Sequence, residues 1–168
     1  MFLWFVSTAV LTVWFVFRDP RFDYRLLIVG SVLADLDGLF GGAGVMHSVL
    51  FSVVLLAVVM VATVGRKPVR RLLLGLPIGT FLHLVFDGAW TDTHVFWWPF
   101  GGTAVGDAPL PSVSRGAWSL LLEAIGLALC VWIWRRARLG ERSRRATFWH
   151  EGRLDLAVGA SRRGGVVD

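Results

Sequence analysis

Cysteine is almost absent from this 168-residue chain, and no linker divides it, so its length suits one domain. The single cysteine, Cys130, lies in an apolar run, which excludes a disulfide within one chain. No basic segment precedes the first apolar run, and no small-residue cleavage site comes before Arg18. We therefore expect a retained N-terminal helix rather than a cleaved signal peptide.

Apolar residues, by contrast, are abundant. They make up 55% of the chain, which also holds nine tryptophans, and the mean hydropathy is +0.64. An isoelectric point near 10.9 could suggest nucleic acid as a partner. The arginines, however, stand between or after long apolar runs, which is how membrane proteins use basic residues. The composition therefore predicts an integral membrane protein that does not bind nucleic acid.

The apolar runs predict an all-α fold, a polytopic membrane bundle of about five transmembrane helices. The hydrocarbon core of a bilayer needs about 20 mostly apolar residues per helix, with about 17 as a lower limit. The runs that meet or approach this length cover residues 2–17, 26–40, 45–64, 72–90 and 117–134. Residues 1–138 then form the transmembrane domain. Residues 139–168 form a basic cytoplasmic tail, partly disordered at residues 159–168.

The basic residues test this topology. Alternating spans put sixteen of the seventeen on one side of the membrane and leave only Arg115 on the other. The sixteen are Arg18, Arg21, Arg25, Arg66, Lys67, Arg70 and Arg71 between the spans, and the nine arginines that follow the last span. Basic loops stay in the cytoplasm, so we expect the N-terminus outside and the C-terminus inside.

Ionisable side chains interrupt the apolar runs. Each costs about 2.5–3.5 kcal/mol at a helix centre on insertion scales, so each needs a reason. The set in or beside the spans consists of Asp35, Asp37, His47, His83, Asp87, Asp92, His94 and Glu123. The predicted topology brings these residues, from separate segments, to the outer half of the membrane.

The spacing of these residues refines the picture. His83 and Asp87 are four residues apart, so they share one helix face and can bind one ion or each other. Asp35 and Asp37 are two residues apart, about 200° around a regular helix. Both can reach one site only if the helix unwinds there, and the glycines that follow make this plausible.

Carboxylate and imidazole together are typical ligands of zinc, manganese or iron. We therefore interpret Asp35, Asp37, His47, His83 and Asp87 as ligands of one or two divalent metal ions, with zinc or manganese favoured. Glu123, His94 and Asp92 are then candidates for the general acid or base. Hydrogen bonds between helices, or a path for protons or ions, would explain the same residues without a metal.

Four segments resemble one known family. Ala34-Asp35-Leu36-Asp37, His47-Ser48, the stretch His83–Asp87 and the loop Phe96–Phe100 are similar, in order and spacing, to motifs of the YdjM family of bacterial and archaeal inner-membrane proteins, which are classed as metal-dependent hydrolases. The resemblance covers about residues 30 to 102. It implies a location in the bacterial cytoplasmic membrane and a metal site at the acidic pair, the His-Ser element and the later His and Asp.

The chain departs from the family pattern at one element. The family carries a histidine, an arginine and a glycine before its His-Ser pair, whereas this chain has Gly42, Ala43 and Gly44 there. The N-terminal run also lacks the histidine that many members carry. His47 is therefore the one imidazole of its element.

Three functions are consistent with these features. The first is a membrane-embedded, metal-dependent hydrolase that acts on an ester or phosphoester of a lipid or lipid-linked substrate from the extracytoplasmic side, with the loop Trp97–Phe100 at the entrance. The second is an ion-coupled transporter. The third is a non-catalytic membrane subunit or scaffold, whose polar cluster locks the helices and whose basic tail docks a protein partner or anionic lipid.

Overall fold

The computed structural model describes residues 1–19, 22–103 and 110–156. Within these ranges the chain forms helices and turns and no β-strand, which confirms the all-α fold class. The predictions for Arg21 and for disorder at residues 159–168 lie outside the described residues.

The helices follow the apolar runs. In chain order they are α1 (Phe2–Phe17), α2 (Tyr24–Leu33), the 3₁₀ helices η1 (Ala34–Phe40) and η2 (Val45–His47), α3 (Val49–Ala62), α4 (Lys67–Leu73), α5 (Gly75–Phe86), η3 (Ala89–Thr91), α6 (Thr93–Phe96), α7 (Pro111–Ser114), α8 (Ala117–Arg136) and α9 (Arg142–Glu151).

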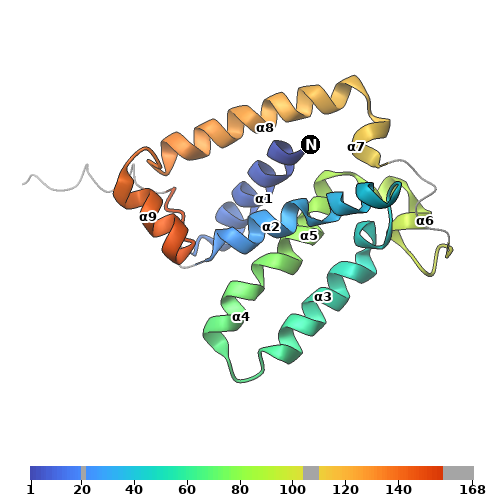
Figure 1. Cartoon of the computed structure of the whole chain (residues 1–168), viewed down its shortest axis with the longest axis horizontal. Helices are drawn as coiled ribbons and strands as arrows, with labels where there is room; N and C mark the ends of the chain where they lie inside the picture. Colours follow the sequence, from blue (N-terminus) through green and yellow to red (C-terminus); the bar gives the residue numbers. More distant parts are fainter. Residues whose placement is uncertain (20–21, 104–109, 157–168) are drawn as a thin grey trace, which may run out of the picture.

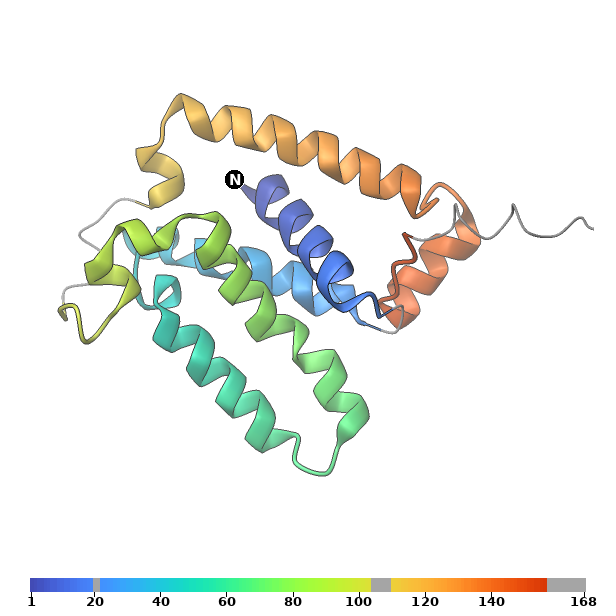
Figure 2. The ribbon, with the colours of Figure 1, turned by 180° about the vertical axis from the view of Figure 1, so that it is seen from behind.

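The bundle is built around the pair α2 and α5, which pack along each other. Helix α1 contacts both members of this pair and also α8, so it lies between α8 and the rest of the bundle (Figures 1 and 2). Helix α3 contacts α5 and forms a hairpin with α4. The elements η1, η2, η3 and α6 gather at one end of this arrangement, and α9 lies at the other (Figure 1).

Glycine allows two of these contacts to be backbone against backbone. A Cβ on Gly79 of α5 would lie 2.7 Å from the Ser31 nitrogen and 2.8 Å from the Gly30 carbonyl carbon of α2. A Cβ on Gly126 of α8 would meet the backbone of Trp4 in α1 in the same way. Small residues at such crossings are typical of helices that pack in a membrane.

Within the described residues, two helices are long and apolar enough to cross a membrane: the continuous stretch Lys67–Phe86, which joins α4 to α5, and Ala117–Arg136. The stretches Phe2–Phe17 and Val49–Ala62 are apolar but shorter. The predicted run 2–17 coincides with α1. The predicted run 72–90 includes the end of α4 and all of α5, and the helix extends before it to Lys67, through Arg70 and Arg71. Lysine and arginine are good helix formers, so the helix begins before the apolar run does.

The segment assigned to a basic tail is folded as far as residue 156. Leu154 and Leu156 are buried in the same apolar cluster as Val10, Tyr24 and Leu27. The Tyr24 nitrogen donates to the Gly152 carbonyl at 2.8 Å. Residues 139–156 therefore belong to the bundle, although they follow its last long helix.

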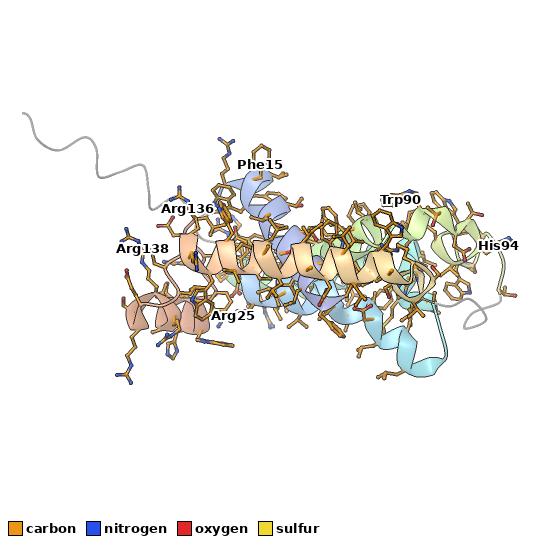
Figure 3. All side chains as sticks on the ribbon, turned by 90° about the horizontal axis from the view of Figure 1, so that it is seen from above. Phe15, Arg25, Trp90, His94, Arg136 and Arg138 are labelled. Carbon is orange, nitrogen blue, oxygen red and sulfur yellow. The ribbon has the colours of Figure 1, made fainter. Side chains whose placement is uncertain are left out.

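Several arginines gather at one end of the molecule. Figure 3 shows Arg25, Arg136 and Arg138 towards this end and Trp90 and His94 at the opposite end. Arg25 also ties α9 to α2, because its guanidinium donates to the Trp149 carbonyl at 2.8 Å. The end that holds η1, η2, η3 and α6 is therefore the end away from this arginine cluster.

Candidate metal centre

His83 and Asp87 lie one turn apart at the C-terminal end of α5. His83 and Asp87 are only 1% and 2% exposed, respectively. The His83 Nδ1 donates to the carbonyl oxygen of Ser31 in α2 at 2.8 Å, and its ring packs against Phe5 of α1 with centroids 4.0 Å apart. The packing of α5 on α2 and α1 therefore fixes the orientation of the imidazole.

His47 reaches the same place from the chain reversal before α3. The Ser48 hydroxyl caps α3 by accepting from the Phe51 nitrogen, so His47 falls in η2, just ahead of the helix. One oxygen of Asp37, Oδ2, accepts from the nitrogens of Gly44 and His47 and from the His47 Nδ1, at 3.0, 3.1 and 3.0 Å. Asp37 thus holds the turn and the imidazole together.

The three side chains converge. The ligand atoms of His47, His83 and Asp87 all lie within 4.8 Å of one another, and the His47 Nε2 lies 3.7 Å from the Asp87 Oδ2. Among the residues that the structure describes, these three form the one such group. Ligand bonds of about 2 Å would require only modest side-chain rotations to meet at a single centre.

The atoms that face this centre have no hydrogen-bond partner among the described residues. They are the Nε2 atoms of His47 and His83 and the Oδ2 of Asp87. Leaving a buried polar atom unpaired costs about 1–3 kcal/mol, so three in one place need an explanation. A bound cation supplies one, because all three are lone-pair donors.

The second nitrogen of each imidazole is occupied. The Ser31 carbonyl can only accept, so the His83 Nδ1 carries the proton and its Nε2 keeps a lone pair for the centre. The carboxylate of Asp37 likewise accepts the proton of the His47 Nδ1, which leaves the lone pair on the His47 Nε2 for the centre. Metal-bound histidines typically donate their other ring nitrogen to a carboxylate or a carbonyl in this way. The residues therefore fit a metal.

Replacing Asp37 by asparagine is expected to weaken metal binding about 10- to 100-fold, the usual cost of losing a partner that orients a ligand. An amide oxygen accepts the His47 proton less strongly, and its NH₂ group can face the imidazole instead. The measurement is competition with a chelator of known affinity. Asp92→Asn is the matched control, because Asp92 caps α6 through the nitrogens of His94 and Val95. Equal affinities for the two variants would show that Asp37 does not orient the site.

Asp35 lies beside this group rather than in it. Helix α2 ends at Leu33 and continues as the 3₁₀ helix η1 through both acids, so the segment is wound more tightly there and is not unwound as expected. The Asp35 Oδ2 is also buried without a partner, and its carboxylate interacts electrostatically with His47 and Asp87. Direct ligation by Asp35 or Asp37 remains a prediction.

The three candidates for general acid or base have other contacts. Glu123 accepts from the backbone nitrogens of Leu3 and Trp4, at 3.1 and 3.4 Å, and so caps the start of α1. Asp92 caps α6. The exposed His94 donates through Nδ1 to the Gly101 carbonyl at 2.6 Å, within the tryptophan-rich loop. None of the three belongs to the group of ligand atoms, and a catalytic role for them remains a prediction.

Two participants were not identified from the sequence. One is the Ser31 carbonyl, which no residue pattern could indicate. The other is Arg115, whose guanidinium pairs with the Asp87 Oδ1. A signal for Arg115 did exist, because it is the one basic residue that the predicted topology leaves on the extracytoplasmic side.

Comparison with protein-family models, with curated proteins and with solved structures gives no match to this chain. The resemblance to the YdjM family therefore remains a prediction from the motifs. The function is therefore inferred from the geometry of the centre.

Proposed function

We propose that this chain is a membrane-embedded, metal-dependent hydrolase that acts on an ester or phosphoester of a lipid or lipid-linked substrate from the extracytoplasmic side. The observation that carries the proposal is the convergence of three buried, unpartnered ligand atoms from His47, His83 and Asp87. Two of them belong to imidazoles that other groups orient.

Two imidazoles and one carboxylate are a ligand set of catalytic zinc sites, which leave a further position for water. Manganese also accepts mixed nitrogen and oxygen ligands. The described residues supply one such group, so we assign one divalent cation. When bound, the cation would act as a Lewis acid and bring the pKa of a coordinated water towards neutrality.

The chain's own residues then divide the remaining work. Asp37 and the Ser31 carbonyl hold the two imidazoles in place. Of the acids nearby, Asp35 has a buried oxygen without a partner, whereas the carboxylate of Glu123 is engaged by backbone nitrogens. We therefore assign to Asp35, rather than Glu123, the role of accepting a proton from the attacking water.

The outer surface of the bundle supports placement in a membrane. Helix α8 has 20 residues and high hydropathy, yet only 11% of its most apolar stretch is buried inside the protein. A core helix of a soluble protein would be mostly buried. Exposed side chains such as Phe15, Val61 and Leu120 continue this apolar surface on α1, α3 and α8. We propose five membrane spans, with α2 and η1 together forming the second.

The separation of charge supports the orientation. The arginines at the α9 end (Figure 3) would face the cytoplasm, because basic segments are retained there. The metal centre then lies towards the extracytoplasmic side of what we propose is the bacterial cytoplasmic membrane. Helix α9 carries Arg142, Arg144, Arg145 and the 69% exposed Trp149. These residues suit contact with anionic lipid head groups or a protein partner at the inner surface.

An apolar cavity favours a substrate with a hydrocarbon chain. It has a volume of about 470 Å³, lies between α1, α3 and α5, and is lined by side chains such as Val13, Leu56 and Phe81. Leu82, which also lines it, directly precedes His83. Burial of an acyl chain there would contribute about 0.8 kcal/mol per methylene group.

The non-catalytic scaffold has one observation in its favour. Asp87 is already paired with Arg115, and a buried acid that is neutralised by arginine needs no metal. This alternative leaves the two unpartnered Nε2 atoms unexplained. The transporter remains a prediction without an observation that favours it.

Removal of the metal tests the proposal. The protein purified in detergent is expected to carry about one equivalent of zinc or manganese by elemental analysis. A chelator should abolish hydrolysis of a lipid phosphoester or ester, and the metal should restore it. If the fully folded protein carries no stoichiometric metal, the scaffold is favoured over the hydrolase. Hydrolysis that survives complete removal of the metal would contradict the metal-dependent mechanism.

A further inference from the structure

Arg115 occupies an unusual position for a basic residue of this chain. It follows α7, and its guanidinium donates from Nη2 to the Oδ1 and backbone carbonyl of Asp87. The Nε donates to the Pro111 carbonyl at 3.0 Å. The side chain is 28% exposed. Arg115 is therefore held beside the metal centre but is still reachable from outside.

The same arginine lines a cavity of about 480 Å³ next to the centre, together with Asp87, Trp90 and Ser114. Asp87 connects the cavity with the metal centre, because it lines this cavity and also supplies one of the converging ligand atoms. In the part of the chain that the structure describes, the Arg115 Nη1 has no acceptor, whereas Nε and Nη2 do. The Nη1 group of the guanidinium can therefore donate hydrogen bonds to a ligand.

The balance of charge explains why an anion would be accepted here. The carboxylates of Asp37 and Asp87 lie in the centre, and that of Asp35 lies beside it. A bound divalent cation and Arg115 would offset this negative charge. Without Arg115 an approaching anion would meet a more negative, poorly solvated site.

We propose that Arg115 binds the anionic phosphoryl group of the substrate, so that the substrate of this centre is a phosphoester. The inference rests on the proposed function and narrows it. A carboxylic ester is uncharged and offers an arginine no ionic partner, whereas the oxygens of a phosphoryl group can engage a guanidinium and a metal at once.

The test measures binding of inorganic phosphate to manganese-loaded protein by calorimetry, with metal content determined on the same samples. Arg115→Gln is expected to weaken phosphate binding at least about tenfold, as loss of a charged hydrogen bond does. Arg115→Lys should lie between the two, because an ammonium group keeps the charge but loses the planar fork. Arg136→Gln, at an exposed position at the end of α8, should bind phosphate like the wild type.

The outcomes separate the two proposals. Wild-type protein that binds no metal contradicts the proposed function. Two results would overturn the role of Arg115 in binding phosphate. One is metal-loaded wild-type protein that does not bind phosphate. The other is that both metal-loaded Arg115 variants bind phosphate as tightly as the wild type. If Arg115→Gln loses its metal, the phosphate affinity of Arg115→Lys tests the role of Arg115 instead, since lysine preserves the charge beside Asp87.

Two further probes identify the source of the phosphoryl group. Short-chain phosphatidic acid that binds at least tenfold more tightly than inorganic phosphate indicates a lipid phosphoester, and equal affinity indicates a soluble one. Hexanoate carries an apolar chain and a carboxylate but no phosphoryl group. Binding of hexanoate as tight as that of phosphatidic acid would overturn the assignment of a phosphoryl site.

Discussion

Replacing His83 by alanine is expected to remove the stoichiometric metal, with a loss of affinity greater than about 100-fold. Loss of a residue that merely orients a ligand costs about 10- to 100-fold, and His83 supplies a ligand atom itself. Its Nε2 is buried and unpartnered, and His83 belongs with His47 and Asp87 to the group whose ligand atoms lie within 4.8 Å of one another. The other imidazole of this group, that of His47, is already a ligand, so no spare imidazole among the described residues can replace His83.

The matched control is His150→Ala, which removes a histidine from the exposed surface of α9. It should retain its metal. Because His83 also packs against Phe5, His83→Asn serves as a second variant that keeps more of the side-chain volume. Thermal unfolding of the metal-free proteins separates loss of a ligand from loss of packing. Full metal content in both His83 variants would contradict the proposed centre.

Much of this architecture could be predicted from the sequence because long apolar runs have few alternatives. The run 2–17 is α1, and the apolar run expected from residue 117 forms a helix that begins at Ala117. The pairing of His83 with Asp87 follows from their four-residue spacing on a helix. The position of His47 beside Asp37 follows from a short reversal before α3. These predictions rest on local geometry, which a sequence specifies directly.

The remaining features depend on contacts between distant segments. Glu123 was identified as an acid inside a span, but its backbone partners at Leu3 and Trp4 lie about 120 residues away in the sequence. Leu154 and Leu156 stand among charged residues in the segment predicted to be a basic tail, whereas both side chains are buried in the bundle. Such partners become visible only once the helices are placed.

The close crossing of α2 and α5 links the fold to the metal centre. Gly75 and Gly79 form a small-xxx-small pattern on α5, and both lie against the backbone of α2. The same crossing brings the Ser31 carbonyl to the His83 Nδ1. A side chain that separated the two helices would therefore disturb the fold and the orientation of a metal ligand together.

Gly79→Ala is expected to lower the free energy of unfolding by about 1–3 kcal/mol, the usual cost of overpacking, and towards the upper end because the obstructing atoms are backbone. A Cβ at this position would lie 2.7 Å from the Ser31 nitrogen, so α2 must shift and the bond from His83 to the Ser31 carbonyl must lengthen. Metal affinity should then fall as well. Denaturation in detergent micelles and competition with a chelator measure the two effects.

Gly140→Ala provides the comparison, because a Cβ at this glycine would have no atom within 4 Å. Its unfolding free energy should stay within about 0.5 kcal/mol of the wild type, and its metal affinity should not change. If Gly79→Ala lost stability but kept full metal affinity, the Ser31 carbonyl would not be what orients His83. If it lost neither, the backbone contact between α2 and α5 would not hold the bundle together. A joint loss is the result expected when one helix crossing serves both the fold and the site.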